Sequence, residues 1–186
     1  MTEVPAPSGI RLTGFLLLLL ANCWLWMQGL HEFGHVVAAI ASSGRVTKVV
    51  WHFAMISRTD VSPNPHPLFV CWAGPLLGCL LPLIASRALR RSLPLAFFTG
   101  FSLVANGAYL GVGSFDRVGD AGTLLQHGSP IAMLWIAGSF AIVTGFCIWH
   151  RMGAFNELQA WTVPGSQVTI QAVLFVVTVV LQVLLQ

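Results

Sequence analysis

Five apolar runs, each long enough to cross a lipid bilayer as a helix, dominate this chain of 186 residues. A hydrocarbon core of about 30 Å takes about 20 helical residues. Only 8% of the residues are charged, whereas about a quarter are charged in an ordinary soluble domain. We therefore predict an all-α, polytopic integral membrane protein in which residues 1–186 form a single membrane domain. The predicted spans are approximately 12–41, 67–86, 94–114, 130–149 and 167–185.

The segment between the first two runs departs from the helical pattern. Residues 45–53 are rich in β-branched side chains and partly alternate between polar and apolar, which is typical of a strand. We expect a short membrane-associated β-hairpin here, following the first span. We interpret Arg58, Thr59 and Asp60 as a turn, and the proline-rich residues 62–67 as a break before the second span.

Charge and cysteine content exclude two classes of protein. The formal net charge is +3, and the basic residues are scattered over loops instead of forming a stripe, so we expect no nucleic-acid partner. The four cysteines lie in apolar segments without a C-x-x-C pair, which argues against a disulfide or cysteine-metal framework. The expected partner is the lipid bilayer, and the expected location is a bacterial cell membrane.

Near the end of the first run, the sequence His31-Glu32-Phe33-Gly34-His35 combines two histidines with a glutamate. Residues i and i+4 lie on one face of an α-helix, so His31 and His35 can present two imidazoles to one metal ion. Glu32 lies beside them, where a carboxylate can act as a base on water. Ionisable groups within a membrane span are costly and generally carry function. The spacing therefore predicts a zinc site with Glu32 as its catalytic base.

A third zinc ligand must come from elsewhere in the chain, because a catalytic zinc ion takes three protein ligands and keeps a fourth position for water. Glu3 and Glu157 lie in polar terminal or loop stretches, and Asp60 lies in the interpreted turn. Asp116 and Asp120 remain. Both follow the third span, on the side of the membrane where the first span ends.

We favour Asp120 over Asp116 as this ligand. Small residues surround Asp120 in the sequence Gly119-Asp120-Ala121-Gly122, and they allow a backbone to approach a metal-bearing helix closely. Asp116, in contrast, is followed directly by Arg117, a ready charge partner. Asp116 stays open as the alternative.

Three segments together resemble the site-2 protease family of intramembrane zinc metalloproteases. They are His31–His35 in the first span, Ala73-Gly74-Pro75-Leu76-Leu77-Gly78 in the second, and Asp120–Leu125 after the third. The family pattern has His-Glu-x-x-His, then a Gly-Pro-containing segment, then an Asp-Gly-Gly-like segment with the last zinc ligand. Here residue 121 is alanine where the family commonly has glycine, and no segment is long enough for a PDZ domain. The resemblance covers about residues 10–130 and implies a minimal catalytic core.

The chemistry of the motif and the resemblance together predict a zinc-dependent endopeptidase. Zinc lowers the pKa of a bound water to about 7, and Glu32 takes the proton of that water and passes it to the leaving amine. The expected substrate is a membrane protein, with a single-span helix as its cleaved segment. The alternative is a zinc-binding membrane scaffold or a metal carrier without proteolysis. Glu32 discriminates between them, because only a protease needs a base beside the histidines.

Three further polar residues are weaker candidates. Gln28 shares the helical face of the motif, so it is a candidate for orienting a ligand or the substrate, or for an interhelical hydrogen bond. Asn106 and Tyr109, in the third span, are candidates for holding the substrate backbone or for joining helices.

Overall fold

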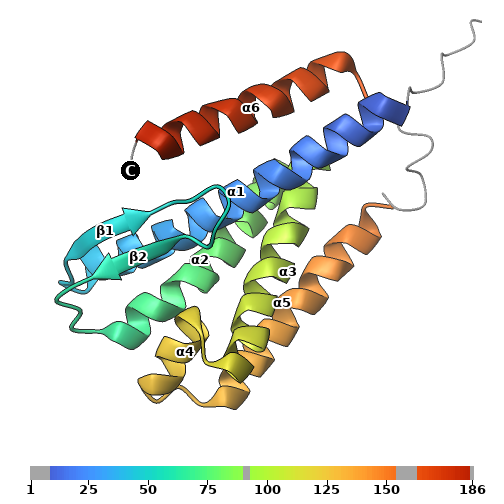
Figure 1. Ribbon diagram of the computed structural model, residues 1–186. Helices are drawn as coiled ribbons and strands as arrows, with labels where there is room; N and C mark the ends of the chain where they lie inside the picture. Colours follow the sequence, from blue (N-terminus) through green and yellow to red (C-terminus); the bar gives the residue numbers. More distant parts are fainter. Residues whose placement is uncertain (1–8, 90–92, 154–162, 185–186) are drawn as a thin grey trace, which may run out of the picture.

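The computed structural model describes residues 9–89, 93–153 and 163–184, and it is almost entirely helical. The described residues form six helices and a two-stranded sheet (Figure 1). Five of the helices are long and apolar enough to cross a membrane. They are α1 (Gly9–Ala41), α2 (Pro67–Ala88), α3 (Leu93–Asp116), α5 (Ile131–Arg151) and α6 (Gly165–Leu184). The predicted fold class and all five predicted spans are confirmed, although residue 185 of the last span lies outside the described residues.

Helix α1 contacts α2, α3, α6 and both strands of the sheet. It packs against α2 on one side and α6 on another, while α3 lies between α2 and α5 (Figure 1). With 33 residues it is about 50 Å long, more than a bilayer core requires. Its last turns are packed in protein, since Ala38 and Ala39 form a cluster with Val70 of α2 that Val46 and Val61 complete.

The predicted hairpin follows α1 and lies alongside it (Figure 1). Strand β1 (Val46–Val50) pairs antiparallel with β2 (Arg58–Val61), with Val49 opposite Thr59. The interpretation of residues 58–60 as a turn was wrong, because these residues form the second strand. The strand is only four residues long, and the polarity of these residues gives no strand pattern in the sequence.

Pro82, one of two prolines inside α2, helps to determine how α2 meets α3. Pro82 has no N–H, so the carbonyl of Gly78, four residues earlier, lacks its helical donor. Ser102 of α3 supplies the missing donor, with its Oγ 2.7 Å from the Gly78 oxygen. Thr99 Oγ1 likewise donates to the Pro82 carbonyl at 3.0 Å. The α2–α3 register is thus fixed by buried hydrogen bonds one turn away from Asn106.

A short helix, α4 (Gly119–Gln126), follows α3 and was not predicted as a separate element. Two residues with positive φ, Arg117 and Gly119, reverse the chain between the end of α3 and the first turn of α4. Ala121 and Leu124 are fully buried against Leu110, Leu134 and Cys71 of the neighbouring helices. This packing holds α4 beside the C-terminal half of α1.

Candidate metal centre

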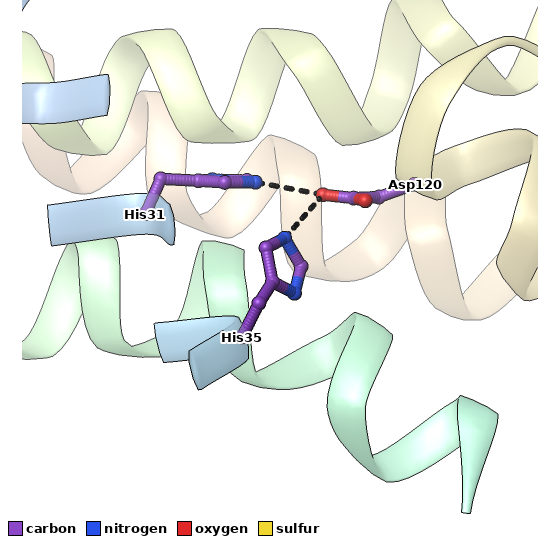
Figure 2. Close-up of side chains that lie close together, drawn as sticks. All are labelled: His31, His35 and Asp120. Carbon is purple, nitrogen blue, oxygen red and sulfur yellow. Dashed lines mark hydrogen bonds and ion pairs between the residues drawn. The ribbon is translucent and has the colours of Figure 1, made fainter. Parts of the chain in front are cut away.

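Three polar side chains from two distant parts of the chain meet at one point (Figure 2). His31 and His35 project from α1, and Asp120 projects toward them from α4. Asp120 Oδ2 lies 2.7 Å from His31 Nε2 and 3.2 Å from His35 Nε2. Both histidines are buried, and the ligand-type atoms of the three residues all lie within 4.8 Å of one another. The structure therefore brings together the three residues for which the sequence predicted a shared site.

The remaining nitrogen of each histidine is committed to an oxygen acceptor. His31 Nδ1 donates to Asn106 Oδ1 at 2.7 Å, and His35 Nδ1 donates to the Val70 carbonyl at 2.8 Å. A neutral imidazole with its proton on Nδ1 has its lone pair on Nε2. In that neutral state, both lone pairs are directed at the Asp120 carboxylate. Such partners of the outer nitrogen fix the tautomer and ring orientation in metal-binding histidines.

Asn106 is itself held in one orientation. Its Nδ2 donates to the Ser102 carbonyl at 2.9 Å, which leaves Oδ1 as the atom facing His31. Ser102 also satisfies the Gly78 carbonyl that Pro82 leaves without a donor. A chain of hydrogen bonds therefore connects the Gly78 carbonyl of α2, through Ser102 and Asn106 of α3, to the ring of His31.

Glycine at position 74 is required by the close approach of α2 to the two histidines. A Cβ atom there would collide with His35 Nε2 and would lie 2.9 Å from His31 Nε2. No side chain fits between the helices at this point. The Gly-Pro segment of the second span therefore lies directly against the two histidines.

The position of Asp120 depends on the start of α4. Gly119 has a φ of +56°, a conformation that glycine adopts without steric cost. The Asp120 N–H points to the hydroxyl oxygen of Tyr109 at 3.4 Å, and Cys71 Sγ lies 3.4 Å from the Asp120 carbonyl. Burial raises the pKa of the Asp120 carboxyl, but when His31 and His35 are protonated their hydrogen bonds and positive charge outweigh it and hold the pKa well below its usual range. Asp120 is thus ionised.

The other acidic candidates do not join this group. Asp116 is exposed at the end of α3 and is not among the three clustered residues. Asp60 lies in β2, where its Oδ1 is 3.4 Å from Arg58 Nε. Glu3 and Glu157 lie outside the described residues. The geometry therefore favours Asp120 over Asp116, as the sequence reasoning did.

Glu32 lies one residue after His31 and is 5% exposed. Its Oε2 accepts a hydrogen bond of 2.7 Å from the Thr59 hydroxyl of β2. Sequence reasoning missed this partner, because it assigned Thr59 to a turn. The signal available in the sequence was only a short polar stretch between Ile56 and Val61, which is too weak to predict a contact across 27 residues.

The clustered residues and Glu32 line a cavity of about 880 Å³. Its wall is built from α1, the 56–62 segment that contains β2, the first turns of α2, the middle of α3, and α4. The lining includes polar atoms of Gln28, Asn106 and Tyr109 beside apolar ones such as Met27 and Val70. A site within the membrane-spanning bundle is thus in contact with a space large enough for water and for a short peptide segment.

The donor set fits a divalent transition metal. An ionised carboxylate faces the acceptor nitrogens of two imidazoles, and three acceptors at such distances repel one another unless a cation lies among them. Two histidines and one carboxylate are ligands that zinc accepts in catalytic sites, with a further position left for water. A protonated imidazole is the other cation that can balance Asp120, so metal analysis distinguishes the two states.

No protein-family model, curated protein or solved structure matches this chain.

Asn106, Tyr109 and Gln28, the weaker candidates from the sequence, each make a specific contact in the structure. Asn106 holds His31, and Tyr109 lies edge-on to the His31 ring, with centroids 5.6 Å apart. Gln28 bonds to the hairpin: its Oε1 accepts from the Ser57 N–H at 2.7 Å. The sequence placed Gln28 on the correct helical face but did not identify the hairpin as its partner.

Proposed function

We propose that this chain is a zinc-dependent intramembrane endopeptidase, similar to site-2 proteases, in a bacterial cell membrane. Its substrates would be membrane proteins, cleaved in or near a transmembrane segment. The observation that carries the proposal is the convergence of His31, His35 and Asp120 beside Glu32, with both histidines and Glu32 on a helix suited to crossing a membrane. The imidazole Nδ1 bonds to Asn106 and Val70 add to it, because a metal site needs its ligands held in one tautomer.

Zinc held by these three residues would supply Lewis acidity, which activates water and polarises a peptide carbonyl. Glu32 then accepts the proton of the attacking water and delivers it to the amine of the leaving chain. Its Oε2 is held by Thr59, and Oε1 has no hydrogen bond within the described part of the chain, so Oε1 is the oxygen that takes the proton.

A polypeptide substrate must be locally extended, because the peptide bonds of a helix are shielded by their own hydrogen bonds. The hairpin offers an extended partner. Most of the cavity-lining residues of the hairpin lie in the 56–62 segment, which contains β2. An unwound single-span helix would therefore enter the cavity along β2 and pair with it by edge addition.

The test combines zinc analysis with a cleavage assay on the purified chain in proteoliposomes. Fluorescein-labelled β-casein serves as an unfolded polypeptide probe, and reconstituted single-span proteins serve as membrane probes. We expect about one zinc ion per chain and cleavage that 1,10-phenanthroline stops. Glu32→Gln should keep the zinc and lose at least about 100-fold in turnover. Cleavage by Glu32→Gln at the wild-type rate would refute the mechanism.

A matched pair of carboxylate variants locates the third ligand. Asp120→Ala should lose the zinc, whereas Asp116→Ala should keep both zinc and cleavage, because Asp116 is exposed and lies outside the cluster. The reverse result would transfer the ligand role to Asp116. Wild-type protein that binds zinc but cleaves neither probe would favour the alternative function, a zinc-binding membrane scaffold or metal carrier.

A further inference from the structure

One face of α1 is joined to the hairpin region by a ladder of hydrogen bonds. Trp24, Gln28 and Glu32 stand four residues apart, so they form a row along the helix. Trp24 Nε1 donates to the Phe53 carbonyl at 3.2 Å, and Gln28 Nε2 to the His52 carbonyl at 3.5 Å. Gln28 Oε1 also accepts from the Ser57 N–H. These two residues fasten the loop between β1 and β2 to α1.

The third residue of the row is the proposed catalytic base. Glu32 accepts the hydroxyl proton of Thr59 at 2.7 Å, a length typical of a charge-assisted O–H···O bond. Thr59 and Val61 share one face of β2, because side chains alternate along a strand. Val61 packs against the Ala38–Ala39 cluster on α1, which directs Thr59 toward the same helix. The contact is thus fixed from both the strand and the helix.

We propose that Thr59 is a positioning residue for Glu32, so that docking of the hairpin and orientation of the base depend on the same contact. The terminal torsion of a glutamate is broad and poorly determined by itself. A single strong bond to Oε2 selects one carboxylate orientation in the cavity that Glu32 shares with the clustered histidines and Asp120. The inference rests on the proposed peptidase function and adds a regulating element to it: a hairpin displaced from α1 leaves the base unaligned.

The decisive comparison is between Thr59→Val and Thr59→Ser. Valine keeps the shape and strand preference of threonine but cannot donate, whereas serine keeps the hydroxyl. With labelled β-casein, Thr59→Val should lose about 10-fold or more in kcat with KM changed by less than about twofold, and zinc per chain should stay unchanged. Thr59→Ser should stay within about threefold of the wild type. Thr144→Val is the matched control, since among the described residues the Thr144 hydroxyl bonds only to the Phe140 carbonyl, within α5.

Hydrogen exchange of residues 57–61 tests the contact without any proteolysis. Thr59→Val and Glu32→Leu should each speed exchange there, and the double variant should speed it no further, because both remove the same bond. Additive effects would overturn the contact. Wild-type kcat in Thr59→Val, or equal losses in Thr59→Val and Thr59→Ser, would overturn the positioning role while the peptidase function stands. A wild-type chain that cleaves neither probe would instead remove the peptidase function, and this inference with it.

Discussion

Helix α1 carries two buried polar regions that differ in how their hydrogen-bonding groups are used. In the first, Asn22 Nδ2 donates to the carbonyl and the side-chain oxygen of Gln171 on α6, at 2.9 and 2.8 Å. The second, nine residues further along, contains His31, Glu32 and His35 and lines the cavity. A rise of 1.5 Å per residue separates the two regions by about 14 Å. The same helix therefore contains a helix–helix contact and a candidate reaction site.

The two regions differ in whether their buried hydrogen-bond donors and acceptors are matched, and this difference separates a structural contact from a candidate reaction site. Asn22 and Gln171 place donors against acceptors, as interhelical hydrogen bonds do in many membrane bundles. When both imidazoles are neutral, the histidine region instead places acceptors against an acceptor: two Nε2 lone pairs and an ionised carboxylate. That arrangement is unfavourable without a cation. Burial alone does not distinguish the two regions, since Asn22 and Glu32 are each 5% exposed.

The largest difference between the two regions should be seen on removing His35. His35→Ala takes away one of three ligands, so zinc affinity should fall by more than the roughly 10–100-fold typical of losing an outer partner. Inductively coupled plasma mass spectrometry of dialysed protein should find almost no zinc. Asn22→Ala serves as the control on the same helix and should keep the metal. Full zinc in His35→Ala would reduce the histidine region to another structural contact.

The next largest effect is expected from a single added methyl group. Gly74→Ala introduces a Cβ that would collide with His35 Nε2, so α2 must shift or the ring must turn away. Zinc affinity should fall by about 100-fold, comparable to removing a strong outer partner. Gly111→Ala is the matched control on α3, because a Cβ there meets nothing within 4 Å. It should leave zinc binding intact and stabilise the helix by about 0.5–1 kcal/mol.

Removing the Asn106 side chain should have a smaller effect on the metal. Asn106→Ala leaves the His31 ring free to rotate and to change tautomer, which should weaken zinc binding by about 10–100-fold while the stoichiometry at saturating zinc stays near one. A competition titration with a fluorescent chelator measures this. Asn106→Asp keeps an acceptor for His31 Nδ1 and should bind zinc more tightly than Asn106→Ala. Equal affinities in the two variants would show that the hydrogen bond to His31 is not what holds the ligand.

The fold could be predicted largely from the sequence, because each span is a continuous apolar run whose length the bilayer dictates. The elements that were missed are short. Strand β2 has four residues, three of them polar, and α4 has eight residues with glycines at positions 119 and 122. Neither contains enough residues to show a period. Both are held by tertiary contacts, as with Val61 on the Ala38–Ala39 cluster and Leu124 beneath α2.

The site residues, like the elements of the fold, are of two kinds: some follow from a local sequence pattern, and others depend on contacts between distant parts of the chain. The spacing of His31 and His35 follows from helical geometry, so one segment of sequence predicted their common face. Asp120 required knowing on which side of the membrane each span ends. The contacts of Asn106 and Thr59 join residues 75 and 27 positions away, and no local pattern encodes those distances. These outer partners became apparent only once the helices and the hairpin were positioned in space.

The smallest expected effect is at the structural region itself. Asn22→Leu removes the bond to Gln171, and interhelical hydrogen bonds in membranes contribute about 0.6 kcal/mol on average and up to about 1.7 kcal/mol. Unfolding in mixed detergent–SDS micelles should therefore shift only slightly, and zinc content and cleavage should not change. Gln171→Leu should act alike, and the double variant should cost less than the sum of the single ones because both remove one contact. A loss of zinc in Asn22→Leu would mean that the two regions of α1 are coupled through the helix, and that the α6 contact also holds the histidines in place.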